Sequence, residues 1–230
     1  MTIKHNNKSA KERILSTCVQ MFIEKGFKQT TMLDIIKEAN VSAGTFQNIF
    51  RTKDGVLLAL VEFMFENQFS IARSTIKNEN GILIYAIETA IQLAITECNE
   101  NLREIYIEAY TQPELCEYIH KKTTIENIKF FSKYNSNWET SDFYEAEIGS
   151  SGIMRSFVVH KCDMYFTLKK KTERFLSMAF DIYHIPNDEA RQAITVINSM
   201  DIIAIANSVM KQLFSKLEMT FDFKFSNSPS

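Results

Sequence analysis

The stretch TTMLDIIKEANVSAGTFQNIF, residues 30–50, decides the fold of the first part of this chain. Thr31 stands three residues before Asp34, which is the spacing of a capping box, with Asp in place of the preferred Glu or Gln. This pair predicts the start of a short helix. Asn40 and the valine after it predict a tight turn, and Ser42 is placed to cap the next helix, which is expected to end near the last residue of the stretch. Two short helices joined by a turn follow from this pattern.

Helical periodicity continues on both sides of this stretch. Apolar residues repeat at three- and four-residue steps over residues 14–23, and Gly26 is placed to end that helix. Further helices are expected at residues 52–77, 82–99, 102–110, 113–134, 143–161, 168–183 and 188–218. Only six Gly and three Pro interrupt 230 residues, which favours long helices over the many turns of a sandwich or barrel. The predicted fold class is all-α. Residues 220–226 alternate like a strand and are interpreted as a loosely docked end.

The composition is that of a core-forming protein. Hydrophobic residues make up 45% of the chain and charged residues 23%, which excludes collagenous, low-complexity and largely disordered proteins. Four separated cysteines without a C-x-x-C pair indicate neither a zinc ribbon nor a disulfide framework. No apolar segment follows the polar N-terminus, so no signal peptide is predicted. The most apolar stretch, residues 82–95, is interrupted by Glu88 and Gln92 and is too short to cross a bilayer. We expect a cytoplasmic protein without a membrane partner.

The net charge of −2 conceals an asymmetry along the chain. Residues 1–60 hold nine Lys or Arg against five Asp or Glu, whereas residues 61–230 hold seventeen against twenty-three. A basic end on an acidic chain is typical of a segment that meets a polyanion. Chance scatter of a few surface lysines is the alternative explanation.

The helix expected after Ser42 has two unlike faces. At 100° per residue, Phe46, Ile49 and Phe50 fall on one side and Gly44 falls opposite them. The outward and flanking positions are Gly44, Thr45, Gln47, Asn48 and Arg51. Small side chains permit close approach to a major groove, and Asn or Gln can bond adenine bidentately. An ordinary solvated face is the alternative, although such a face more often holds Glu and Lys.

Lys53 stands in the first turn of the next helix, where a positive charge opposes the helix dipole. A DNA phosphate beside this amine and the helix N-terminus would reverse that effect. Thr31, at the start of the second helix, can present its hydroxyl and nearby amides to a phosphate in the same way, and this role is compatible with capping.

Residues 10–60 resemble the DNA-binding domain of the TetR/AcrR family of transcription regulators. The resemblance rests on Ile14-Leu15, Phe22, Gly26-Phe27, Thr30-Thr31, Ile35-Ile36, Ala39, Val41-Ser42, Gly44-Thr45-Phe46, Phe50, Lys53 and Leu57-Leu58, without a gap. It implies a helix-turn-helix domain at residues 1–55, joined to a larger helical domain for ligand binding and dimerisation at residues 56–230. The implied DNA contacts are Thr31, Ser42, Ala43, Gly44, Thr45, Gln47, Asn48 and Lys53, with Lys53 on backbone phosphate.

The function that this resemblance implies is a homodimeric, ligand-responsive regulator. Members of the family are usually repressors, released from a palindromic double-stranded DNA operator by a small effector that is here expected to be partly hydrophobic. Two positions depart from the family pattern. Gln47 and Asn48 replace a common aromatic pair, and Gly55 replaces a common Glu, so that the fourth helix is expected to fray at its start. The alternative function is an activator or adaptor of the same fold that acts through a protein partner.

The larger part of the chain supplies aromatic residues for both a core and a ligand pocket. The residues expected to line the pocket are Phe65, Phe69, Tyr106, Tyr110, Phe131, Trp138 and Met154. The last two predicted helices, residues 168–183 and 188–218, have wide apolar surfaces and are expected to form half of a four-helix dimer interface. Burial of these surfaces within the monomer is the alternative.

Catalytic and metal-binding patterns are weak. Four dispersed histidines and the lack of G-x-S-x-G, P-loop and H-E-x-x-H motifs argue against an enzyme. Cys116 with His120, and His160 with Cys162, have spacings that could hold a metal, but such pairs arise easily by chance. We predict no enzymatic activity, no cofactor and no metal.

Overall fold

The computed structural model describes residues 9–75 and 80–217, except for the side chains at 66, 68, 69, 71, 72 and 75. Within these ranges the chain forms eleven α-helices and no strand, as the all-α prediction requires. They are α1 (Ala10–Lys25), α2 (Met32–Glu38), α3 (Ala43–Ile49), α4 (Lys53–Thr75), α5 (Gly81–Cys98), α6 (Glu100–Ala109), α7 (Pro113–Phe131), α8 (Thr140–Val159), α9 (Leu168–Ile182), α10 (Asn187–Asn198) and α11 (Ile202–Lys216). The expected strand-like segment at 220–226 lies outside the described residues.

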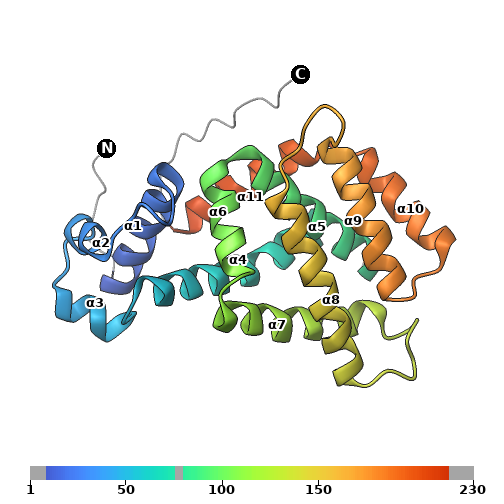
Figure 1. Cartoon of the computed structure of the whole chain (residues 1–230), viewed down its shortest axis with the longest axis horizontal. Coiled ribbons are helices and arrows are strands. Elements are labelled where there is room, and N and C mark those ends of the chain that lie inside the picture. Colours follow the sequence, from blue (N-terminus) through green and yellow to red (C-terminus); the bar gives the residue numbers. More distant parts are fainter. Residues whose placement is uncertain (1–8, 76–79, 218–230) are drawn as a thin grey trace.

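Helices α1, α2 and α3 form a head at one end of the molecule (Figure 1). The predicted capping box at the start of α2 is confirmed: Thr31 accepts from the N–H of Asp34, and the Asp34 carboxylate accepts from the N–H of Thr31. Ser42 caps α3 as expected, since its side chain accepts from the N–H of Thr45 at 3.0 Å. These caps satisfy amides that a short helix would otherwise leave unbonded.

The junction between α3 and α4 explains the glycine at position 55. The N–H of Gly55 donates to the Thr52 hydroxyl at 3.1 Å, which caps the start of α4. A Cβ at this position would collide with the carbonyl oxygen of Phe50. The close approach of the two backbones therefore requires glycine, and the hydroxyl of Thr52 caps α4 without the Glu that the family often has. α4 then runs for 23 residues from the head into the rest of the protein, about 34 Å at 1.5 Å per residue.

The remaining helices form a body around α5 (Figure 1). Fourteen of the eighteen residues of α5 are buried, and α4 and every helix from α6 to α11 pack against it. Among the described residues, α5 is the single unbroken helix long and apolar enough, with a mean hydropathy of 1.4, to suit a membrane span. However, 78% of it is buried inside the body, as expected for the core helix of a folded domain.

The prediction of one continuous helix over residues 188–218 is wrong. The segment forms α10 and α11, which meet at 75°. Ser199 ends α10, and the Asp201 side chain accepts from the N–H of Ala204 to start α11. Helix α11 then packs against α5 and α4, so that Met210 and much of the apolar surface expected at a dimer interface are buried in the monomer.

Candidate nucleic-acid interface and effector cavity

Helix α3 presents the face that its sequence predicts. Phe46 and Phe50 are buried in the head, with their ring centroids 6.1 Å apart, and Ile49 is half-buried. The opposite face carries Ser42, Ala43, Gly44, Gln47 and Asn48, all of which are exposed. None of the seven residues of α3 is acidic, so the exposed face has no charge that would repel a phosphate backbone.

Gly44 lies at the open side of this face. A Cβ built there would meet only the Ser42 hydroxyl, at 3.8 Å, which is an ordinary contact. Packing within the head therefore does not require glycine here. Thr45, beside it, is half-buried, and its hydroxyl lies 2.8 Å from that of Ser42. The result is a low surface over the first turn of α3, with two hydroxyls at its edge.

Thr31 is exposed, but its polar groups are occupied. Its hydroxyl donates to the Asp34 carboxylate at 2.7 Å, in addition to accepting from the Asp34 amide. These bonds hold the pKa of Asp34 below its ordinary value. The ionised Asp34 therefore stands where a phosphate would approach the N-terminus of α2. A phosphate contact from Thr31 would require its hydroxyl to exchange Asp34 for the DNA.

Lys53 is half-buried, and its ammonium turns toward the head rather than outward. It donates to the carbonyl oxygens of Phe27 at 2.8 Å and Thr30 at 3.1 Å, and it lies 4.1 Å from the centroid of the Phe27 ring. Lys53 thus also has a role within the head that the sequence did not indicate. Two of the three N–H groups of the ammonium join α4 to the loop between α1 and α2, which leaves one for a phosphate.

Two further residues of the head face outward. Arg51, exposed and with a positive φ of 60°, lies two residues after the end of α3. The helical wheel already placed it beside the outward positions. Leu33 of α2 is an exposed large apolar side chain. The sequence signal for Leu33 was its position away from the apolar face formed by Ile35, Ile36 and Ala39.

Two capped helices joined by a turn, the second with an exposed, acid-free face, define a helix-turn-helix DNA-binding domain. Residues 14–60 match the family model for bacterial regulatory proteins of the tetR family. The uncharacterized HTH-type transcriptional regulator YerO of Bacillus subtilis is 40% identical to this chain over 53 residues. Another uncharacterized HTH-type transcriptional regulator of the same organism, YvkB, is 36% identical to this chain over 64 residues. This part of the chain is therefore similar to the DNA-binding domain of tetR-family regulators.

The matches with these relatives cover only a small part of each chain. The match with YerO covers 23% of this chain and 18% of YerO, and the match with YvkB covers 28% and 34%. Among solved structures, Salmonella enterica GusR aligns over 91% of this chain and 95% of its own, with 17% identity and a TM-score of 0.47. A gamma-butyrolactone receptor, an ArpA-like protein, aligns over 89% and 97%, with 11% identity and a TM-score of 0.41.

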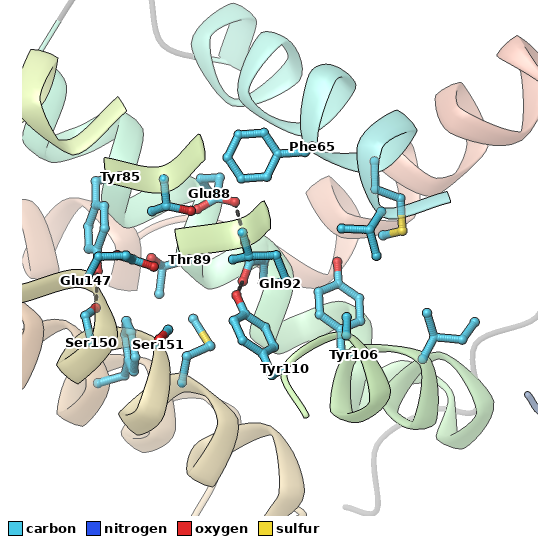
Figure 2. Close-up of a pocket in the computed structure, with 18 residues that line it drawn as sticks. Phe65, Tyr85, Glu88, Thr89, Gln92, Tyr106, Tyr110, Glu147, Ser150 and Ser151 are labelled. Carbon is cyan, nitrogen blue, oxygen red and sulfur yellow. Dashed lines mark hydrogen bonds between the residues drawn. The ribbon is translucent and has the colours of Figure 1, made fainter. Parts of the chain in front are cut away.

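A cavity lies in the body between α4, α5, α6, α7, α8 and α9 (Figure 2). Its free volume is about 70 Å³. Four of the residues expected in a pocket line it: Phe65, Tyr106, Tyr110 and Met154. The side chain of Phe69 lies outside the described part of the structure. The aromatic and polar lining residues that sequence reasoning did not name are Tyr85, Glu88, Thr89, Gln92, Thr123, Glu147, Ser150, Ser151 and Phe175.

Phe131 and Trp138 do not line this cavity, contrary to expectation. Phe131 is fully buried in the core and stacks on Tyr183, with ring centroids 4.7 Å apart. Trp138 lies in the connection between α7 and α8 and packs edge-on against Phe143 and His184, at 5.0 and 5.2 Å. An aromatic residue at helical spacing looks the same in sequence whether it faces a cavity or a neighbouring ring, so periodicity could not separate the two.

Polar groups meet on the cavity wall. The Tyr85 hydroxyl lies 3.2 Å from that of Ser150, and the Tyr110 hydroxyl donates to Oε1 of Gln92 at 3.3 Å. Gln92 in turn donates to the Glu88 carboxylate. Figure 2 shows these side chains around the same space. Polar groups that converge in an otherwise apolar cavity are typical of a ligand site.

The residue pairs considered for metal binding have other partners. Cys116 donates to the carbonyl oxygen of Ala109, and Nε2 of His120 lies 2.7 Å from the Ser151 hydroxyl. His160 caps the end of α8, and the N–H of Cys162 donates to Glu97. Within the described ranges, no group of three or more His, Cys, Asp or Glu residues is placed to hold a metal ion.

Proposed function

We propose that this protein is a transcriptional regulator that binds double-stranded DNA through the exposed face of α3. The observation that supports this most strongly is the acid-free outward face of α3, held on a buried Phe46 anchor within a domain that matches the tetR family. On this proposal Gln47 and Asn48 read base edges in the major groove, and Gly44 permits close approach. Arg51 and the remaining N–H of Lys53 would add phosphate contacts. The related Bacillus proteins are named as transcriptional regulators of the same type.

The DNA-binding unit is proposed to be residues 1–55, with residues 56–230 as the regulatory unit. The boundary falls inside α4, so the two parts are joined by an unbroken helix. A second connection runs through α6. The side chain of Asn101 donates to the carbonyl oxygen of Ile23 at 2.8 Å, and Lys28 pairs with Glu108 at 3.1 Å. Both α4 and α6 also line the cavity, which supports a coupling between its contents and the position of the head.

A homodimer is the proposed working form, because a palindromic operator requires two heads. Because much of α11 is buried in the monomer, we place the candidate dimer interface on the outer surfaces of α9 and α10, which lie side by side (Figure 1). Met178 on α9 and Val196 on α10 are 40% and 38% exposed, which is high for large apolar side chains. Their burial against the same helices of a second copy would give an isologous four-helix contact.

Regulation is proposed to be repression relieved by a small effector in the cavity. An effector that displaced α4 or α6 would shift the heads of the dimer relative to one another and misplace both α3 helices on the operator. A hundredfold loss of operator affinity requires about 2.7 kcal/mol of coupling, within the usual allosteric range. By linkage, operator DNA must then weaken effector binding by the same factor.

A binding assay on DNA from upstream of the protein's own gene tests this function. We expect a retarded complex that survives excess unrelated DNA and a footprint with two-fold symmetry. Asn48→Ala should weaken operator binding by about 1–3 kcal/mol and affect random DNA much less. Asn137→Ala, an exposed change in the body, is the control and should leave both unchanged. Equal affinity for operator and random DNA in the unaltered protein would contradict the proposal.

The second candidate function is an activator or adaptor that works through a protein partner. The observation that favours it is the Gln47-Asn48 pair, which replaces two aromatic residues expected by the family pattern. The same DNA assay separates the candidates, because an adaptor without DNA affinity would give no complex.

A further inference from the structure

Two buried carboxyl groups lie on the wall of the body cavity. Glu88 projects from α5 and Glu147 from α8, and their exposed fractions are only 7% and 4%. Figure 2 places both among the tyrosines that surround the same space. Burial of a carboxylate is costly unless a positive charge accompanies it. The partners of these two groups therefore indicate what the cavity is built to receive.

The bonding partners of both acids are neutral. Glu88 accepts from the amide of Gln92. Glu147 accepts from the amide of Asn127 at 3.0 Å and from the hydroxyl of Tyr183 at 3.1 Å, both at the same oxygen, Oε2. Among the described residues that line the cavity, none is Lys, Arg or His. Burial accordingly raises the pKa of Glu88 to about 7 and that of Glu147 to about 8. A negative charge on Glu88 further opposes ionisation of Glu147.

The other charged and titratable groups around the acids do not supply a cation. Glu126 of α7, which acts on Glu88, is itself negative and is bonded by Arg73 of α4 at 2.5 Å. His120 of α7 is hydrogen-bonded to Ser151, and burial lowers the pKa of its ring, which disfavours the positively charged form. Burial raises the pKa values of Tyr85 and Tyr110, which stay protonated. When ionised, the two acids therefore have no positively charged partner among the described residues that line the cavity.

The rest of the wall suits the apolar part of a ligand. Aromatic rings come from α4, α5, α6 and α9: Phe65, Tyr85, Tyr106, Tyr110 and Phe175. The faces of such rings attract cations as well as apolar groups. Met64 and Met154 also line the space, and their flexible side chains can make room beyond the free volume of about 70 Å³.

We propose that the cavity binds an organic cation, with its positive centre held by Glu88 and Glu147 and its apolar body against the surrounding aromatic rings. This assignment rests on the proposed function, in which the cavity is the effector site. It adds the chemical class of the effector. A neutral ligand would leave the acids protonated, and an anionic ligand would face two carboxyls in a buried space.

A matched pair of probes tests the charge requirement directly on the full-length protein. Benzyltrimethylammonium and neopentylbenzene have the same shape, but only the first has a positive charge. At pH 7.5 we expect the cation to bind at least tenfold more tightly than its neutral isostere. In Glu88→Gln,Glu147→Gln protein the preference should fall below threefold. Glu145→Gln, an exposed change on the same helix as Glu147, should keep the full preference.

Proton release provides a readout that a merely structural role for the acids would not change. A bound cation favours ionised carboxyls, so binding at pH 7 should release protons, and affinity should rise between pH 6 and pH 8. Calorimetry in two buffers of different ionisation enthalpy measures that release, which the double variant should lose. The proposal is overturned if the cation binds no better than the isostere, fails to bind up to millimolar concentration, or binds the double variant with an unchanged preference.

Operator binding measured in parallel keeps this result separate from the proposed function. If the cation binds but no DNA complex forms, the proposed regulator function is wrong and the assignment of the ligand class holds. If a DNA complex forms but the protein shows no charge preference, the ligand class is wrong and the regulator function holds.

Discussion

The ammonium of Lys53 lies over the ring of Phe27, 4.1 Å from its centroid, and donates to the carbonyl oxygen of the same residue at 2.8 Å. The lysine belongs to the first turn of α4, and Phe27 belongs to the loop after α1. Phe27 is itself buried and packs edge-on against Phe22 of α1, with ring centroids 5.1 Å apart. The contact therefore joins the connecting helix α4 to the core of the DNA-binding head. The first turn of α4 is thus fixed to the core of the head.

Lys53→Ala should destabilise the head as well as weaken DNA binding. The change removes two hydrogen bonds from a charged donor and a cation–π contact, which together are worth about 1–3 kcal/mol. Urea unfolding should show this loss in free energy. Lys37→Ala removes an exposed positive charge from α2 without such contacts and serves as the control. If the third N–H of Lys53 bonds a phosphate, the salt dependence of DNA binding should also flatten by about one unit. Unchanged stability would refute the structural role.

Gly44→Ala should separate stability from DNA binding. The new methyl group has space in the free protein, where its nearest neighbour is the Ser42 hydroxyl at 3.8 Å, and alanine in a helix is favoured over glycine by up to about 1 kcal/mol. The variant should therefore unfold no more easily than the parent. On DNA the methyl group would occupy the space between α3 and the groove, and affinity should fall at least tenfold in a gel-shift titration.

Gly149→Ala is the matched control for this change. Gly149 is exposed on α8, and a Cβ there has nothing within 4 Å. This variant should gain similar stability and bind DNA as the parent does. A Gly44→Ala protein with full DNA affinity would show that α3 does not approach DNA at this position.

Met178→Asp with Val196→Asp should give a folded monomer. Both side chains are already partly exposed on the outer surfaces of α9 and α10, so a charge is tolerated in the monomer but would be buried unpaired in the proposed dimer. Sedimentation should show half the mass of the parent. Ile125→Asp, at a 51% exposed position on α7, should remain dimeric. A double variant that still sediments as a dimer would place the interface elsewhere. Met210 is unsuitable for this test because it is buried in the monomer core.

The sequence was sufficient to predict the head because its determinants are local. Capping by Thr31 and Ser42, and the inward faces of Phe46 and Phe50, depend on spacings of three or four residues that the structure reproduces. The break before Asp201 had a local signal too, a run of cap-forming residues, but without glycine or proline the apolar periodicity on either side obscured it. The direction in which Lys53 turns was not predictable, because its partners lie 26 and 23 positions earlier in the chain.

The cavity was harder to predict because its lining comes from six helices. Periodicity identifies which residues of a helix are buried, but it does not tell which neighbour they meet, so Phe131 and Trp138 looked as suitable as Tyr106. Glu88 had a usable signal: it is an acid inside the most apolar stretch of the chain. A carboxyl at such a position must either be paired or face a polar space.

The buried acids should also give the protein an unusual dependence of stability on pH. In the unfolded chain both carboxyls titrate near their ordinary pKa of 4.5, whereas in the folded protein Glu88 and Glu147 hold their protons up to about pH 7 and pH 8. The folded state therefore binds more protons than the unfolded state between these limits. The contribution of these two groups to the free energy of unfolding is fully present below about pH 4.5 and is lost as the pH rises to about 8.

Glu88→Gln,Glu147→Gln should remove this dependence, because glutamine keeps the shape and most of the bonding capacity but does not titrate. Relative to the parent, the double variant should gain free energy of unfolding from pH 5 to pH 8, by about 1.4 kcal/mol per pH unit for each acid that titrates, and by a constant amount above that. Urea unfolding at one-unit pH steps measures the difference. Glu145→Gln, exposed on α8, should follow the parent at every pH. Parallel profiles for the parent and the double variant would show that folding does not raise the pKa of either carboxyl, which would remove the charge argument for a cationic ligand.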